Sequence, residues 1–173
     1  MELKNLIRDV PNFPKHGIIF KDITTLLKDP AGLNNATEEL LNFLQNKQIT
    51  KVVGIESRGF ILGGIVAQKL GAGFVPIRKP GKLPAETISE NYSLEYGTDK
   101  IEIHKDAIQK GDKILLHDDL LATGGTMEAA CKLVERLGGE VVQISFLIEL
   151  TFLNGRKRLE NYNVRSLIQY DSE

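Results

Sequence analysis

Residues 113–126 constrain the fold more than any other stretch of the sequence. An apolar run opens the stretch at residues 114–116, and a run this short is typical of a buried parallel strand. Two adjacent acids, Asp118 and Asp119, follow where that strand should end. Apolar residues then recur at helical spacing from residue 127 to residue 137. Between acids and helix lies a glycine-rich turn, made of Ala122, Thr123, Gly124, Gly125 and Thr126.

The glycine-rich turn has the chemistry of an anion site. It leads into a helix N-terminus, where backbone N–H groups lack partners and the helix dipole is positive. Gly124 and Gly125 let the backbone approach a ligand without an intervening Cβ, and the two threonines add hydroxyl donors. The stretch lacks the P-loop pattern G-x-x-x-x-G-K-[ST], so it predicts a different kind of phosphate site. An ordinary capped turn with solvated acids is the alternative.

Length and charge exclude several classes of protein. The chain has 173 residues and a formal net charge of −1. This suits one domain over residues 1–173 and implies no general attraction to nucleic acid or an anionic membrane. No apolar stretch approaches the roughly 20 residues of a transmembrane helix, and charged residues interrupt any N-terminal signal peptide. We therefore expect a cytoplasmic protein, with its one cysteine, Cys131, in the core and no cluster of metal ligands.

Strand and helix patterns alternate along the rest of the chain. Asp29 and Pro30 form a helix start, as an N-cap acid followed by proline at the first helical position. Strands interleaved with helices predict an α/β fold with a mostly parallel central sheet and helices on both faces. We expect helices over residues 3–10, 30–47, 60–70 and 154–161, and strands over residues 18–23, 51–55, 73–77, 141–150 and 164–170.

Charged residues follow two more of the expected strands. The sequence Glu56-Ser57-Arg58 comes directly after one of them, and a loop with three cations, Arg78, Lys79 and Lys82, follows the other. Surface ion pairs and solvated charge are the ordinary explanation of such residues. Because open α/β sheets bind ligands at the carboxyl ends of their strands, a bound polyanion is the alternative explanation.

The nonapeptide D-D-L-L-A-T-G-G-T at residues 118–126 resembles the signature that binds phosphoribosyl pyrophosphate (PRPP) in the type I phosphoribosyltransferases. Within that family it looks most like the adenine-specific branch. The resemblance implies the type I phosphoribosyltransferase fold. It also implies that Asp118 and Asp119 hold the ribose hydroxyls, while the glycine-rich turn wraps the 5′-phosphate.

Two more segments are similar to this family. The resemblance implies that Ser57 and Arg58 contact PRPP, that Arg58 also binds its pyrophosphate, and that the Glu56–Ser57 peptide is cis. It further implies that Arg78, Lys79 and Lys82 bind pyrophosphate. Pro80 stands where some relatives carry another cation, which leaves the exact ligand set open.

A base-binding segment is implied by the pattern F-P-x-x-G-I-I-F-K-D-I over residues 13–23. By resemblance, the backbone at Ile19 and Lys21 reads the edge of adenine and Phe20 packs on its face, with Leu120 in the same pocket. A backbone amide supplies both a donor and an acceptor, which suits N1 and the 6-amino group of adenine. Residues 1–25 are expected to form a hood over the base.

A lid is expected over about residues 80–104, because the polar stretch 85–99 is weakly periodic and long polar loops often cover active sites. Isoleucines and charged residues alternate over residues 101–104, so we expect strands or a hairpin to flank this flexible stretch. Its L-E-Y-G sequence is similar to the family's catalytic loop. That similarity makes Glu95 the candidate general acid or base and Tyr96 its neighbour in the lid. Without the resemblance, Glu95 would be an ordinary exposed acid.

The resemblance implies transfer of the phosphoribosyl group from PRPP to adenine, giving AMP and pyrophosphate in purine salvage. Mg²⁺ is expected as the Mg–PRPP complex, held mainly by PRPP and water, and the family is usually homodimeric. The same chemistry on xanthine or guanine is one alternative. A non-catalytic regulator that senses PRPP and binds nucleic acid or a protein is the other. We expect such a regulator to carry an added basic domain, which this chain lacks.

Overall fold

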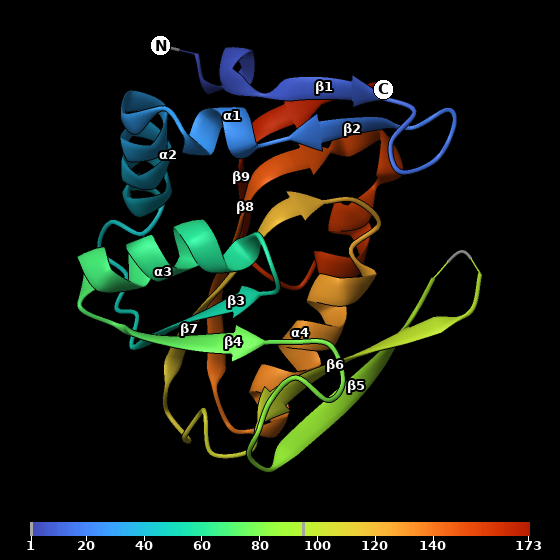
Figure 1. Ribbon diagram of the computed structural model, residues 1–173. Coiled ribbons are helices and arrows are strands. Elements are labelled where there is room, and N and C mark those ends of the chain that lie inside the picture. The colour runs from blue at the N-terminus through green and yellow to red at the C-terminus, as the bar shows by residue number, and fades with distance from the viewer. Residues whose placement is uncertain (1, 95) are drawn as a thin grey trace.

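A five-stranded parallel sheet forms the centre of the computed structural model, which describes residues 2–94 and 96–173 (Figure 1). The strands lie in the order β4 (Gly73–Ile77), β3 (Lys51–Ile55), β7 (Lys113–Leu121), β8 (Glu140–Leu150) and β9 (Val164–Tyr170). All four neighbouring pairs are parallel. The predicted strands over 51–55, 73–77, 141–150 and 164–170 are therefore confirmed, and so is the α/β class.

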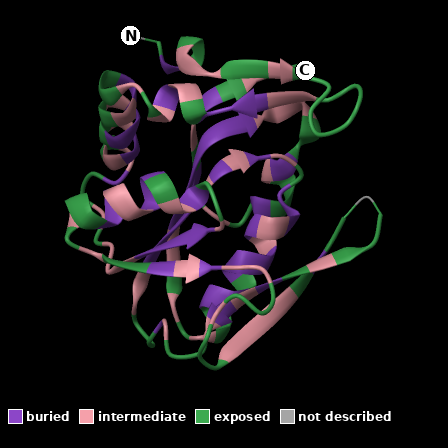
Figure 2. Cartoon of the chain, in the orientation of Figure 1, coloured by how far each residue is buried: buried purple, intermediate pink, exposed green. Residues whose placement is uncertain are grey.

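Helices cover both faces of this sheet. Successive residues of a strand point to opposite faces, so each face has its own hydrophobic core with the helices that cover it. Helices α2 (Pro30–Asn42) and α3 (Gly59–Leu70) pack with Val52 and Leu115 in one core. Helix α4 (Gly125–Arg136) packs with Val53 and Leu116 in the other. Because both faces are covered, most residues of the middle strands are buried, and apolar residues such as Val52, Val53, Leu115 and Leu116 fill the interior (Figure 2).

Local sequence signals fix the ends of these helices. Asp29 accepts a hydrogen bond from the Gly32 N–H at 2.7 Å, which confirms the predicted N-cap of α2. Helix α3 ends at Gly71, whose left-handed φ of +66° favours glycine. Helix α2 ends at Asn42, five residues before the predicted end at residue 47.

Two antiparallel hairpins project from the central layers (Figure 1). Strands β1 (Arg8–Pro11) and β2 (Ile19–Asp22) form the first, beside the short helix α1 (Thr24–Leu27). Strands β5 (Thr87–Ser93) and β6 (Thr98–His104) form the second, which extends away from the sheet.

The first hairpin corrects the prediction of a helix over residues 3–10. The structure has a single 3-10 turn, η1 (Leu3–Leu6), and then strand β1, in which Val10 lies opposite Phe20. Pairing with β2 therefore overrides a helical spacing of only a few apolar residues. Pro11 ends β1, and a proline is tolerated at the end of an edge strand.

The second hairpin confirms the expected strands or hairpin in this region, but its strands reach into residues 85–99, where a long polar loop was predicted. Tyr92 and Ile101 are buried on its inner side, while polar residues occupy the outer positions. The expected helix over 154–161 is also replaced, by the 3-10 segments η2 (Thr151–Leu153) and η3 (Gly155–Leu159). Across the residues that the structure describes, no helix is long and apolar enough to cross a bilayer.

Candidate active site

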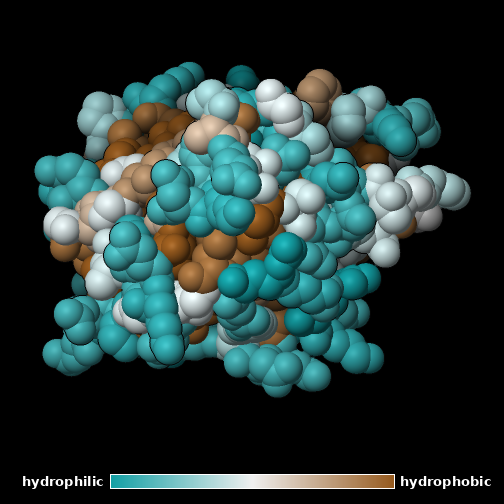
Figure 3. Space-filling model, turned by 90° about the horizontal axis from the view of Figure 1, so that it is seen from below, coloured by the Kyte–Doolittle hydropathy of each residue, from teal (hydrophilic) through white to brown (hydrophobic). Residues whose placement is uncertain are grey.

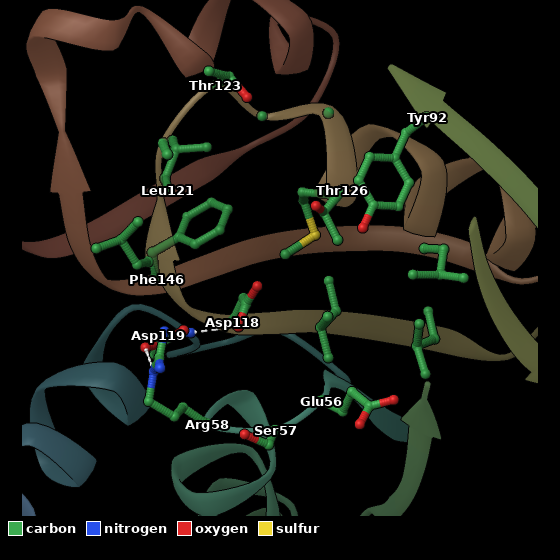
Figure 4. Close-up of a pocket in the computed structure, with 18 of the residues that line it drawn as sticks. Glu56, Ser57, Arg58, Tyr92, Asp118, Asp119, Leu121, Thr123, Thr126 and Phe146 are labelled. Carbon is green, nitrogen blue, oxygen red and sulfur yellow. Dashed lines mark hydrogen bonds and ion pairs between the residues drawn. The ribbon is translucent and has the colours of Figure 1, made fainter. Parts of the chain in front are cut away.

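A cavity of about 420 Å³ opens where β3 and β7 reach the same edge of the sheet (Figure 4). Its walls come from these two strands, the turns that follow them, the start of α4 and the inner side of the β5–β6 hairpin. The lining residues are Ile55, Glu56, Ser57, Arg58, Ile77, Lys79, Tyr92, Ile101, Asp118, Asp119, Leu120, Leu121, Ala122, Thr123, Gly124, Gly125, Thr126, Met127 and Phe146.

The adjacent acids lie within β7, which corrects the prediction that the strand ends before them. Strand β8 is long enough to pair with β7 as far as Leu121, opposite Glu149. Strand β3 pairs with β7 only as far as His117, because the chain turns away after Ile55. Asp118 and Asp119 are therefore supported by a strand on one side and border the cavity on the other.

The two acids have different surroundings. Asp118 points into the cavity, and Asp119 points toward Arg58, with which it forms an ion pair (Figure 4). The Asp119 N–H also donates to Asp118 Oδ1 at 2.8 Å. Desolvation by the surrounding protein and the nearby Asp119 charge hold the pKa of Asp118 well above its usual value. Asp118 is thus a carboxyl group that can keep a proton and donate a hydrogen bond.

The glycine-rich turn occupies the opposite wall and leads into a helix N-terminus, as the sequence predicted. Gly124 is the N-cap of α4, with a left-handed φ of +86°, and the helix begins at Gly125. The first N–H groups of α4 therefore open onto the cavity and have no partners within the helix. This wall can hold an anion such as a phosphate group.

The turn after β3 brings Glu56, Ser57 and Arg58 to the cavity floor. The Glu56–Ser57 peptide is cis, which confirms that expectation. The Arg58 guanidinium lies 5.2 Å from the centre of the Phe20 ring, so it connects the cavity with β2. Arg58 is also the N-cap residue of α3, which fixes its backbone beside the acids.

Glu56 contacts all three of the cationic residues that follow β4. Its carboxylate pairs with Lys82 at 2.7 Å and with Arg78 at 3.5 Å, and it accepts a hydrogen bond from the Lys79 N–H. Burial acts to raise the pKa of Glu56, but these bonds and charges outweigh it and leave the pKa lowered. Glu56 was not predicted as a site residue, although an acid facing a cationic loop at the next strand end was a usable signal.

Lys79 is the cation of this loop that lines the cavity. Its ammonium group forms an ion pair with Asp99 and a hydrogen bond with the Tyr92 hydroxyl at 2.5 Å. Burial acts to lower the pKa of Lys79, but both partners outweigh it and leave the pKa raised. Arg78 and Lys82 are not among the residues that line the cavity, and each forms an ion pair with Glu56.

The predicted base-binding residues divide into two groups. Leu120 lines the cavity, whereas Ile19, Phe20 and Lys21 lie on β2 beside it. Phe20 stacks edge-on against Phe13 at 5.1 Å. The Lys21 side chain is buried and pairs with Asp9 at 2.8 Å, so its ammonium group is already occupied.

The β5–β6 hairpin contains both residues that were predicted for the site and a residue, Tyr92, that was not. Glu95 lies outside the described residues. Tyr96, next to it, is 87% exposed and does not line the cavity. Tyr92 does line it, together with apolar side chains such as Met127 and Phe146, which were not predicted. No sequence signal distinguishes these apolar residues from ordinary core residues.

Cys131 is confirmed as a core residue, and His117, which was assigned no chemistry, is buried within β7. His117 is 1% exposed, with Nδ1 at 3.0 Å from Ser145 Oγ, and burial lowers its pKa to about 4. Cys131 is buried in α4, and burial raises the pKa of its thiol to about 12. Both side chains are therefore uncharged at neutral pH.

Comparison with known proteins identifies the class to which this sheet and cavity belong. A family model described as phosphoribosyl transferase domain matches residues 22–171. The chain is 61% identical over 169 residues to an adenine phosphoribosyltransferase of Halothermothrix orenii, covering 98% of this chain and 99% of that one. It is 57% identical over 170 residues to the enzyme of the same name from Christiangramia forsetii, with 98% and 99% covered.

Solved structures agree. The adenine phosphoribosyltransferase of Thermoanaerobacter pseudethanolicus is 55% identical and superposes with a TM-score of 0.95, over 98% of each chain. The enzyme of Giardia lamblia, solved with 9-deazaadenine, is 43% identical with a TM-score of 0.93, over 98% of this chain and 97% of that one. The chain belongs to the adenine phosphoribosyltransferase family.

Proposed function

We infer that this protein transfers the 5-phosphoribosyl group of PRPP to adenine, forming AMP and pyrophosphate in purine salvage. The observation that carries this inference is one cavity that joins the glycine-rich turn, the adjacent acids and a cationic floor. Those three features match the phosphate, the ribose and the pyrophosphate of one substrate. Full-length relatives named adenine phosphoribosyltransferase supply the acceptor base.

The phosphoribosyl group is proposed to bind along β7 and α4. Backbone N–H groups and threonine hydroxyls of residues 122–126 receive the 5′-phosphate at the start of α4. Asp118 and Asp119 then hold the ribose hydroxyls. Because Asp118 can keep its proton, it is suited to donate one hydrogen bond while Asp119 accepts another.

Pyrophosphate is the leaving group in this proposal. A nitrogen of adenine forms a bond to ribose C1, the C1–oxygen bond to pyrophosphate breaks, and the nitrogen loses its proton. Positive charge grows on the ribose in an oxocarbenium-like transition state, and negative charge grows on the pyrophosphate. Arg58, Ser57 and Lys79 line the cavity, where they can stabilise the negative charge on the pyrophosphate. Arg78 and Lys82 are proposed to add to this stabilisation from their ion pairs with Glu56, which lines the same cavity.

The base is proposed to lie between Leu120 and β2. Phe20 is held beside Arg58 and Phe13, and the backbone of Ile19 and Lys21 borders the same region. Backbone readout would favour adenine over 6-oxopurines, because a 6-oxo base presents an acceptor where adenine presents a donor. Unpaired buried groups can give up to about 10⁴-fold discrimination.

Glu95 is proposed to take the adenine proton, with Tyr96 as its neighbour in the lid. The support is the match of L-E-Y-G to the family's catalytic loop. The described part of the β5–β6 hairpin borders the cavity through Tyr92 and Ile101, which supports a lid role for this segment. The lid over about 80–104 and the hood over 1–25 remain parts of one proposed domain, 1–173.

Magnesium is proposed to arrive as Mg–PRPP. Among the residues that the structure describes, no three or more His, Cys, Asp or Glu side chains group into a metal site. Oxygen ligands from PRPP and water suit Mg²⁺, which usually keeps several waters. Bound in this way, the ion would neutralise charge on the pyrophosphate. No bound nucleic acid or membrane is part of the proposal, and a cytoplasmic location remains a prediction from the sequence.

A homodimer is the proposed assembly. Ile61 of α3 and Phe74 of β4 are 41% and 37% exposed, and Phe74 packs edge-on against Phe60 at 5.8 Å. Seen from below, hydrophobic side chains gather near the middle of a largely hydrophilic face (Figure 3). Sedimentation of the protein and of Phe74→Lys tests this assembly. A dimer that Phe74→Lys dissociates supports it, and a wild-type monomer contradicts it.

A base panel tests the function. The protein is incubated with PRPP, Mg²⁺ and each of adenine, hypoxanthine, guanine, xanthine and orotate, and nucleotide and pyrophosphate are quantified. AMP formed from adenine alone is the expected result. Product from another base would overturn the base assignment and keep the PRPP site. PRPP binding without any product would favour a non-catalytic regulator.

A further inference from the structure

Gly155 lies directly behind the glycine-rich turn, although it does not line the cavity. It begins η3, is buried, and packs against the back of residues 121 and 122. A Cβ added to Gly155 would lie 2.3 Å from the Ala122 carbonyl oxygen and 2.9 Å from Leu121 Cδ1. Real Cβ contacts are not this short, so a side chain here requires the backbone of Gly155 or of Ala122 to shift.

The contact is reciprocal. A Cβ added to Gly124 would lie 2.6 Å from the Gly155 carbonyl oxygen. The two glycines therefore pack backbone against backbone, and Gly155 touches the turn at both Ala122 and Gly124. Gly155 does not have a left-handed φ, so contact alone opposes a side chain at this position.

Arg156, the next residue, fastens Gly155 to the sheet. Its Nε and Nη2 donate to the two oxygens of Glu149 on β8, at 2.7 and 2.8 Å. Its Nη1 also donates to the Val164 carbonyl at 2.9 Å, and Nη2 donates to Ser166 Oγ at 3.1 Å, both on β9. A planar guanidinium that makes a two-pronged contact has little freedom to shift.

The partner of Arg156 is itself fixed. Glu149 is 3% exposed and lies opposite Leu121 in the β7–β8 pairing. Burial acts to raise the pKa of Glu149, but hydrogen bonds from Arg156 and Ser166 outweigh it, so the pKa is lowered and the carboxyl group stays ionised. The residue that anchors Arg156 is thus beside the last rung of β7 before the glycine-rich turn.

We propose that Gly155, held by the Arg156–Glu149 ion pair, is a positioning residue that sets the glycine-rich turn for the 5′-phosphate of PRPP. The inference rests on the proposed function and adds residues outside the cavity to it. Hydrogen bonds to a phosphate depend steeply on distance and angle, so a turn displaced by a few tenths of an ångström loses part of its binding. If Gly155 had only an ordinary packing role, its substitution would lower the stability of the protein without weakening the binding of the 5′-phosphate more than that of the rest of the substrate.

Gly155→Ala tests the contact, with Gly64→Ala as its matched control. A Cβ at Gly64, on the surface of α3, meets no atom within 4 Å. Isothermal titration measures the Kd of PRPP, ribose 5-phosphate and pyrophosphate, and steady-state rates give the KM of adenine. For Gly155→Ala we expect PRPP and ribose 5-phosphate to bind at least about tenfold more weakly, roughly the loss of one charged hydrogen bond. Pyrophosphate and adenine should stay within twofold, and Gly64→Ala should change nothing.

Arg156→Gln and Arg156→Lys test the anchor if Gly155→Ala does not fold. Arg156→Gln should weaken ribose 5-phosphate binding severalfold, and Arg156→Lys should restore part of it. Lys157→Ala, at an exposed position of the same segment, is the control and should bind as the wild type does. A folded Arg156→Gln or Gly155→Ala protein with unchanged ribose 5-phosphate binding would overturn the proposal, as would equal losses for pyrophosphate and adenine. Failure of the wild type to bind PRPP would instead overturn the proposed function.

Discussion

Lys79 and Asp99 form an ion pair between the loop after β4 and strand β6, directly beside the cavity. Tyr92, which lies opposite Asp99 in the hairpin, accepts a hydrogen bond from the same ammonium and donates one to Asp99 at 3.0 Å. A lysine proposed to bind pyrophosphate is thus already neutralised by the hairpin. Pyrophosphate must compete with Asp99 for it.

Asp99→Asn should therefore tighten pyrophosphate binding. The pair is partly exposed, with 39% and 35% of the two side chains accessible, so its strength is that of a surface ion pair. Removing it should strengthen product inhibition by pyrophosphate about 1.5- to 5-fold. Inhibition constants measured for Asp99→Asn and for Asp106→Asn, an exposed acid after β6, check this. Weaker inhibition in Asp99→Asn would show that Asp99 orients Lys79 rather than competing for it.

Asp119→Asn should weaken PRPP binding by about 10- to 150-fold, the range for one hydrogen bond to a charged group. The substitution also removes the partner of Arg58. Asp118→Asn should cost less, because the raised pKa of Asp118 already favours its neutral form. Titration calorimetry with PRPP measures both. Unchanged affinity in a folded Asp119→Asn protein would contradict the assignment of the acids to the ribose.

Glu95→Gln should lower kcat by about 10²- to 10⁴-fold, the usual contribution of a general acid or base. PRPP binding should be nearly unchanged, because the proposed role concerns only the adenine proton. Glu86→Gln is the matched control, since Glu86 lies directly before β5 with 77% of its side chain exposed. Equal kcat values for the wild type and Glu95→Gln would remove Glu95 from the mechanism.

His117 should make the protein less stable as the pH falls. Burial lowers its pKa from 6.5 to about 4, so between these values the unfolded chain binds a proton that the folded chain does not. Stability from this group is complete above pH 6.5 and falls by about 3 kcal/mol by pH 4. Urea unfolding from pH 7 to pH 4 should give a shallower dependence for His117→Gln than for the wild type. His16→Gln, at an exposed position, should keep the wild-type dependence.

The parallel sheet could be predicted because its signals are local. Short apolar runs mark β3, β4, β7 and β8, and a charged or glycine-rich turn follows three of them. Strand ends in a parallel sheet meet at one edge, so Arg58, Lys79 and Asp118 could be assigned to one cavity before their contacts were known. Asp29 is a further local signal, since an N-cap acts within its own helix.

What could not be predicted depends on partners that are distant in sequence. Residues 8–11 form a strand because β2 pairs with them. The strands of the second hairpin continue into the polar stretch 85–99 because Tyr92 and Ile101 are buried against the core. Glu56 pairs with Arg78 and Lys82 and accepts from the Lys79 backbone N–H, and all three residues belong to another strand end. The contact of Gly155 with Gly124 has no sequence pattern at all, since it arises from two backbones that meet in the folded chain.

The pairing of β3 with β7 brings together the two corners that form the cavity, and β4 and the β5–β6 hairpin lie between these strands in sequence. Closing so long a loop is entropically costly, and contacts of this kind form slowly during folding. In a partly folded chain in which β3 and β7 are still apart, the floor and the opposite wall of the site do not face each other. PRPP should therefore bind only the completed fold, and by mass action it would shift the folding equilibrium toward the native enzyme.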